Sequence, residues 1–274
     1  GKGKTSLKTP SEIERVGEIF GWSTRRIDEV KRASRLSAKV DNAVVQDGYT
    51  LYHHAMIVSE DGEWAVVQQG MNPEDRSARR YHWVSTRVRS FVVEPHAAIV
   101  GVRREVVLDL TSRESEGCRK ACVDLIREGP RRISSLLKSI RDPGQSSLAE
   151  WLGEREERAY YLRMPWNINW KAVSRLYNIQ PRSFEELIEV RGVGPSTVRG
   201  LAFIADLVYG EEPSWKDPVK YSFAFGGKDG VPFPVDRKAM DEAIRFLEEV
   251  LAELDISGSE KLRALKRIKR FVNR

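Results

Sequence analysis

The chain has 274 residues, enough for about two domains, and its 41% hydrophobic and 31% charged residues exclude a disordered chain and indicate a globular protein. No apolar run approaches the roughly 20 residues of a membrane span and no signal peptide is visible, so with only two cysteines we expect a cytoplasmic protein without a membrane partner. The net charge of +6 is concentrated in residues 76–104, with seven Arg and one acid, and 261–274, with seven Lys or Arg, a distribution typical of proteins that bind polyanions.

Residues 1–42 are predicted to form a helical N-terminal segment of two helices. The sequence Thr-Pro-Ser at 9–11 supplies a cap and a proline start, Gly21 ends the first helix, and Ser23 caps the second. Apolar residues at helical spacing define the buried faces, which are Ile13, Val16, Ile19 and Phe20 in the first helix and Ile27, Val30, Ala33 and Leu36 in the second.

Residues 43–111 form a predicted β-rich unit, which we expect to be the catalytic one. Residues 51–67 indicate a hairpin, because two apolar, β-favouring runs flank the turn sequence Ser-Glu-Asp-Gly at 59–62. Residues 84–93 alternate between apolar and basic or small polar side chains, which predicts a further strand. Residues 106–110 close the unit.

Helical patterns return after the β-rich unit. Residues 112–144 are predicted to be a helical connector with a break at Gly129-Pro130, and Cys118 and Cys122 within it are expected to face a core. Residues 145–274 are predicted to be a helical domain that holds a hairpin motif, a long loop and two final helices at 237–254 and 260–271. The expected fold class is therefore α+β, a small β-rich unit flanked by helices plus a helical domain.

Residues 183–199 contain the strongest motif of the chain. Ser183 and Glu186 form a capping box, residues 191–194 read Arg-Gly-Val-Gly, and Pro195 is placed to start a new helix whose free N–H groups suit a phosphate. The stretch resembles the helix-hairpin-helix family, which implies sequence-nonspecific binding of a nucleic-acid backbone; a hairpin that only packs is the alternative. The predicted backbone contacts are Arg191, Gly192, Gly194, Ser196, Thr197 and Arg199, joined by Arg79 and Arg80 of the β-rich unit.

Downstream of this motif, Val235-Asp236 is predicted to open a helix. The pair resembles the position that supplies the catalytic carboxylate in DNA glycosylases of the helix-hairpin-helix superfamily, which implies that Asp236 stabilises positive charge on the sugar or activates the attacking group. The chain departs from those enzymes by a longer insertion between Gly194 and Asp236. It also lacks the lysine that lyase-type members carry at the position of Pro195 or Ser196. A helix-capping aspartate is the alternative.

The β-rich unit contains all four histidines of the chain. Carboxylate and amide side chains accompany them, and such a set could hold a divalent metal for phosphodiester cleavage or supply acid–base groups. Adjacent positions of a strand point to opposite faces, so only one of the first two histidines can join a given cluster. Surface or core histidines are the alternative. The candidate catalytic residues are His53, His54, His82, His96, Gln68, Gln69 and Asp47.

Five short segments of the β-rich unit combine polar, aromatic and glycine residues. They are Gln46-Asp47-Gly48-Tyr49, Leu51-Tyr52-His53-His54, Gln68-Gln69-Gly70-Met71-Asn72, Arg80-Tyr81-His82-Trp83 and Glu94-Pro95-His96. With the hairpin motif and the stretch up to Asp236 they resemble the domain of unknown function 763 family of archaea and bacteria. The resemblance implies that both units belong to one protein, and that a further N-terminal region of the same protein precedes Gly1.

We therefore expect a DNA-binding enzyme of the DNA-repair type. The leading hypothesis is a DNA glycosylase that acts on damaged bases through Asp236 and needs no cofactor. The alternatives are a metal-dependent nuclease that uses the histidines with Mg or Mn, and a non-enzymatic adaptor that binds nucleic acid. The motif leaves the choice between DNA and RNA open.

Overall fold

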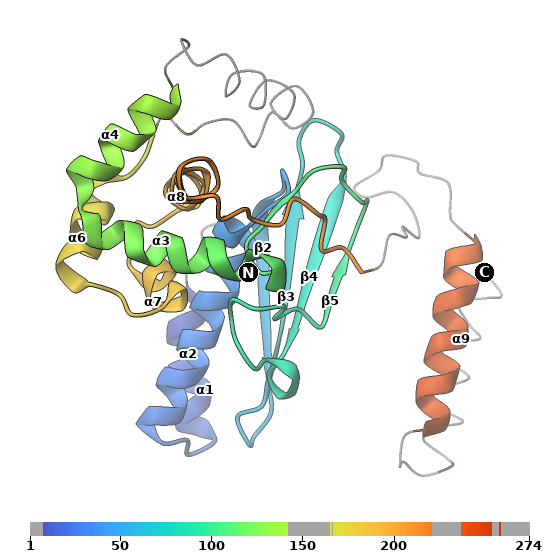
Figure 1. Ribbon diagram of the computed structural model, residues 1–274. Helices are drawn as coiled ribbons and strands as arrows, with labels where there is room; N and C mark the ends of the chain where they lie inside the picture. Colours follow the sequence, from blue (N-terminus) through green and yellow to red (C-terminus); the bar gives the residue numbers. More distant parts are fainter. Residues whose placement is uncertain (1–7, 142–164, 166, 221–236, 254–257, 259–274) are drawn as a thin grey trace. The chain divides into compact units, whose positions relative to one another are not determined.

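The computed structural model describes residues 8–141, 165, 167–220, 237–253 and 258. By compactness the chain divides into two units, Gly1–Tyr221 and Ser222–Arg274. In the first unit helices accompany a four-stranded antiparallel sheet and a separate two-stranded sheet (Figure 1). The predicted α+β class is confirmed.

The first two helices form as the sequence predicts. In α1 (Thr9–Ile19) a proline occupies the first turn, and in α2 (Thr24–Lys39) the Ser23 hydroxyl accepts a hydrogen bond from the backbone N–H of Arg26 at 3.2 Å. Ile19, which we expected on the buried face of α1, is 77% exposed because it lies in the last turn. A π-helix, η2 (Val40–Val44), continues α2, and it places Asp41 fully inside the protein.

The four-stranded sheet has the order β2-β3-β4-β5, formed by Thr50–Val58, Trp64–Met71, Ala78–Val84 and Ala98–Val100. The predicted hairpin is confirmed, with the Gly62 N–H donating to the Ser59 carbonyl at 3.0 Å. The strand expected at 84–93 is wrong, because β4 ends where it was expected to begin and the 3₁₀-helix η3 (Ser85–Arg87) follows. The buried positions of β4 are Arg79, Tyr81 and Trp83, and a buried arginine hides the alternation of apolar residues that marks a strand.

The rest of the first unit is built around one core. β1 (Val45–Gln46) pairs with β6 (Leu108–Asp109), and η4 (Arg113–Ser115) leads into the helices α3 (Glu116–Glu128), α4 (Pro130–Arg141), α6 (Trp170–Ile179), α7 (Phe184–Glu189) and α8 (Pro195–Tyr209). The predicted break at Gly129 is confirmed, and φ there is +87°. Cys118 and Cys122 are buried free thiols, as expected. The core joins residues of α2, the sheet, α3 and α8, among them Leu36, Val66, Trp83, Ile126 and Leu201.

The second unit contributes one described helix. It is α9 (Arg237–Glu253), which confirms the first of the two predicted C-terminal helices and exposes Phe246 and Leu247. The other predicted helix, at 260–271, lies outside the described residues. Within the described part of the chain, every helix is too short or too polar to cross a membrane.

Candidate functional site

The predicted hairpin motif forms two helices joined by a tight turn. The Ser183 hydroxyl accepts a hydrogen bond from the backbone N–H of Glu186 at 3.2 Å, and α7 then runs to Glu189. The turn, Val190–Gly194, depends on Gly192, whose φ of +94° is a left-handed conformation that disfavours other residues. A Cβ built on Gly194 would meet no atom within 4 Å, so the start of α8 is open to a partner.

A pocket of about 830 Å³ lies between α2, β2 and this turn. We call it the hairpin pocket. It brings together Arg191 and Gly192 of the turn and His54 of β2, which are far apart in the sequence and which the sequence analysis assigned to two separate sites. Its wall is formed by Pro10, Arg32, Ser34, Arg35, Leu36, Ala38, Lys39, Asn42, Leu51, His54, Glu189, Arg191 and Gly192.

The hairpin pocket has a strongly basic wall. Arg32, Arg35 and Lys39 follow one another at three- and four-residue spacing, which places them on one face of α2, and Arg191 adds a fourth cation from the turn. Glu189 is the single acidic residue of the wall. The spacing of these three cations was visible in the sequence. The sequence did not show that this face of α2 contacts the hairpin turn.

Three of these cations remain available to an anion. Arg32 is neutralised, because its guanidinium pairs with Glu185 at 2.6 Å and with Glu189. Arg35 and Arg191 are exposed, and neither pairs with a carboxylate among the described residues. The Lys39 ammonium donates to the Val193 carbonyl at 2.5 Å. Its partial burial lowers its pKa.

His54 leads from the hairpin pocket into a buried chain of hydrogen bonds. Its Nε2 lies 2.9 Å from the Ser34 hydroxyl and its Nδ1 lies 3.1 Å from Oε1 of Gln68. The Gln68 amide nitrogen in turn donates to Asp41 Oδ2. The predicted candidates His54 and Gln68 therefore do meet. Burial lowers the pKa of His54, which favours the neutral imidazole.

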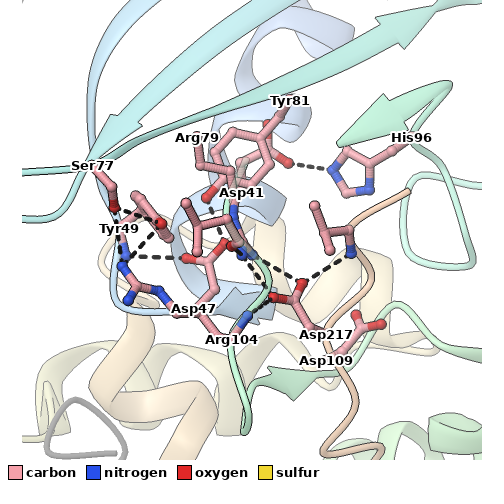
Figure 2. A network of polar contacts seen from close by, with 12 residues as sticks. Asp41, Asp47, Tyr49, Ser77, Arg79, Tyr81, His96, Arg104, Asp109 and Asp217 are labelled. Atoms are coloured by element: carbon pink, nitrogen blue, oxygen red, sulfur yellow. Dashed lines mark hydrogen bonds and ion pairs between the residues drawn. The ribbon is translucent and has the colours of Figure 1, made fainter. Parts of the chain in front are cut away.

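Asp41, which the sequence analysis missed, is the centre of this group. It also accepts a hydrogen bond from Nε2 of His96 at 2.5 Å (Figure 2). The indole nitrogen of Trp83 donates to it as well, at 3.0 Å. We call the group of Ser34, His54, Gln68, Asp41, Trp83 and His96 the Asp41 network. A charged residue between Val40 and the apolar residues at 43–45 was a signal that could have found it, since such a residue is buried only with partners.

Two of the predicted histidines, His53 and His82, lie outside the Asp41 network. His53 pairs in register with Gln69 and His82 pairs with Val67, on the face of the sheet opposite to His54 and Gln68. Strand alternation therefore places His53 and His54 on opposite faces of the sheet, as expected, and His82 lies on the face of His53. Among the described residues no three potential ligands from His, Cys, Asp and Glu converge on one metal position. Arg80 is exposed on the same outer face as His53 and Gln69.

Arg79 and Asp47 form a second buried group instead of a binding surface. The Arg79 side chain is 0% exposed and pairs with Asp47 at 2.8 Å and with Asp217 at 2.7 Å (Figure 2). The Tyr81 hydroxyl donates to Asp47 at 2.6 Å, and the backbone N–H of Tyr49 donates to its other oxygen. A contact of Arg79 with a nucleic-acid backbone is therefore wrong. Asp47, whose side chain is 1% exposed, is no wall residue of the hairpin pocket, and the structure gives it a role in this ion pair.

Of the three residues of α8 that were expected to touch the nucleic-acid backbone, two face the protein and one lies at the surface. Thr197 is buried, so the predicted contact through its side chain is wrong. Arg199 is directed at β1, where it donates to Gln46 at 2.6 Å, and burial lowers its pKa. The Ser196 hydroxyl donates to Asn167 at 3.0 Å at the surface. Because α8 packs its first turn against the β-rich part, a backbone contact stays a prediction for Arg191, Gly192, Gly194 and the surface residue Ser196.

Comparison with known protein families gives one match, which includes most of this site. A family model described as "Protein of unknown function (DUF763)" matches residues 1–235. No curated protein and no solved structure matches the chain. The matched range contains the hairpin pocket and the Asp41 network, and it ends one residue before Asp236. Asp236 lies outside the described residues, so its catalytic role stays a prediction.

Proposed function

The chain belongs to the DUF763 family of proteins of unknown function, and we propose that it is a nucleic-acid-binding enzyme of the DNA-repair type that holds a DNA backbone in the hairpin pocket. One observation carries the proposal: the turn residues Arg191 and Gly192 share a pocket with His54, a buried imidazole of the sheet. An enzyme that acts on nucleic acid requires residues that hold the sugar-phosphate backbone and a titratable group in the same pocket.

The charges of the pocket support an anionic ligand. Arg35, Lys39 and Arg191 offer three cations at one opening, and the glycines of the turn let a sugar-phosphate backbone approach closely. Phosphate contacts of this kind position a nucleic acid without reading its bases. We therefore expect binding that depends little on sequence and strongly on salt.

Fluorescence anisotropy with a labelled duplex tests this binding. The double variant Arg35→Gln/Arg191→Gln should weaken binding and reduce the slope of log K against log salt by about 2, roughly one for each lost phosphate contact. Arg25→Gln is the matched control, because Arg25 lies on the same helix but outside the pocket, where it pairs with Glu29. Equal slopes for the double variant and the control would refute binding in the hairpin pocket.

The product of the reaction distinguishes the remaining hypotheses. Labelled duplexes, each with one modified base, are incubated with the protein in EDTA or in Mg²⁺ or Mn²⁺, and half of each sample receives hot alkali. An EDTA-resistant product that becomes a nick only in alkali, and that Asp236→Asn abolishes, supports the glycosylase hypothesis. A nick that needs metal supports the nuclease hypothesis. Binding without any product supports the adaptor hypothesis.

A further inference from the structure

Ser34, His54 and Gln68 stand in the order of a nucleophile, a base and the group that orients the base. The Ser34 hydroxyl is 2.9 Å from Nε2 of His54, and Nδ1 of the same ring is 3.1 Å from the Gln68 carbonyl oxygen. Both Ser34 and His54 belong to the wall of the hairpin pocket. This succession of contacts is the usual sign of an activated hydroxyl.

The Asp41 network determines which atom carries each proton. The Gln68 amide nitrogen donates to Asp41 Oδ2, so the amide oxygen is the atom that faces Nδ1 of His54. Nδ1 of His54 therefore carries the proton, and the lone pair of Nε2 faces the Ser34 hydroxyl. Two further donors, from Trp83 and His96, hold the Asp41 carboxylate in place. The imidazole is thus fixed in the tautomer that can take a proton from Ser34.

The surroundings of the hydroxyl select the substrate class. Arg35, Lys39 and Arg191 line the same pocket as Ser34. Three cations stabilise the charge that a phosphoryl group gains when a fifth oxygen attaches to it. We propose that Ser34 is the nucleophile of a phosphodiester cleavage in the hairpin pocket, with His54 as its general base. This inference rests on the proposed binding of a nucleic-acid backbone there.

The reaction balances without a further reactant other than water. The proton of the Ser34 hydroxyl moves to Nε2 of His54, a bond forms between Oγ and phosphorus, and the bond from phosphorus to the leaving sugar oxygen breaks. Since the attacking and leaving oxygens lie in line on opposite sides of phosphorus, the leaving oxygen takes its proton from a water molecule on the far side. The resulting hydroxide displaces Oγ from phosphorus, and the imidazolium returns its proton to Oγ, which restores the free hydroxyl. A covalent protein–nucleic acid adduct is the intermediate.

The test looks for this adduct and for the matching strand break. Full-length protein is incubated in EDTA with duplexes labelled at either strand end, quenched in SDS, and the labelled protein band is digested to locate the modified peptide by mass spectrometry. We expect a nucleotide on Ser34 and a nicked strand. Ser34→Ala should abolish both, and His54→Gln should lower the rate by about 10²–10⁴-fold.

Ser37→Ala is the matched control. Ser37 is a buried serine of the same helix, its hydroxyl donates to the Ser34 carbonyl at 3.1 Å, and it lies outside the wall of the pocket. This variant should cleave like the wild type. Thermal unfolding of each variant shows whether it folds. Ser34→Cys keeps a nucleophile at the same place, and if the side chain at position 34 attacks phosphorus, this variant gives an adduct of different chemical stability.

The outcomes separate this inference from the proposed function. Binding in the hairpin pocket with no strand break in EDTA, or with a break that Ser34→Ala leaves unchanged, overturns the role of Ser34 and leaves the binding proposal standing. An adduct on another residue overturns it as well. If the wild-type protein does not bind the duplex in the anisotropy assay, or if the double variant binds it like the Arg25→Gln control, both proposals are overturned together.

Discussion

The ion pair between Arg79 and Asp217 should be one of the strongest single contributions to the stability of the first unit. Asp217 Oδ2 accepts from Arg79 Nη2 at 2.7 Å and from the backbone N–H of Arg104 at 2.6 Å, and its Oδ1 accepts from Arg79 Nη1 at 3.1 Å and from the Val219 N–H at 2.9 Å. Both side chains are almost fully buried. The contact joins the segment that follows α8 to the middle of the sheet.

Asp217→Asn keeps the shape of the side chain and removes its charge. The new NH₂ group faces groups that only donate, and Arg79 is left with Asp47 as its one carboxylate partner. Breaking a buried ion pair from one side costs about 3–5 kcal/mol, and the remaining Asp47 contact places this case at the lower end. We expect a loss of about 3 kcal/mol in the free energy of unfolding, or a fall in Tm of roughly 6–12 °C for a unit of this size.

Urea unfolding followed by tryptophan fluorescence measures the loss, and Asp124→Asn is the control. Asp124 pairs with Arg127 at 2.8 Å, nearly the distance of the buried pair, but both of these side chains are more than half exposed. An exposed pair contributes at most about 1 kcal/mol. If the two variants lose the same stability, burial does not set the strength of the Arg79 pair, and the reasoning fails.

Three further predictions follow from single residues. Gly192→Ala should lower the free energy of unfolding by about 1–2 kcal/mol, since φ is +94° and the new Cβ would lie 2.9 Å from a side chain. Gly194→Ala, which has open space around the new Cβ, should change it little. Urea unfolding compares the two variants. Tyr81→Phe should cost about 1.5–3 kcal/mol by the same measurement, because it leaves the buried Asp47 without one of its donors, and an unchanged stability would contradict this. His54 should titrate below its ordinary pKa of 6.5 in histidine NMR spectra. Because the unfolded chain then binds the proton more tightly than the folded protein, the contribution of His54 to the free energy of unfolding is full above pH 6.5 and declines as the pH falls. The variant His54→Gln should reduce this decline.

Local patterns in the sequence were sufficient for most of the helices and for the first hairpin. The Ser23 cap, the proline at the start of α8 and the turn at 59–62 act through contacts between neighbouring residues, so their effect does not depend on the rest of the fold. The pairing of His54 with Gln68 could also be predicted, because a short turn fixes the register of the two strands. The family resemblance, which rests on residues alone, is confirmed as well.

Tertiary structure decided which polar residues are functional candidates and which are structural. Arg79 and Asp47 have the residue types of a binding site, but each is buried by residues that lie up to 138 positions away and serves an ion pair. Conversely, the roles of Ser34 and Asp41 depend on their hydrogen bonds with His54 and Gln68, which come from two strands of the sheet. The sequence by itself determined most of the helices, the first hairpin and the surplus of positive charge. The hairpin pocket arises only when α2, β2 and the turn meet, since a contact between distant segments depends on how the whole core packs and not on the residues beside each group.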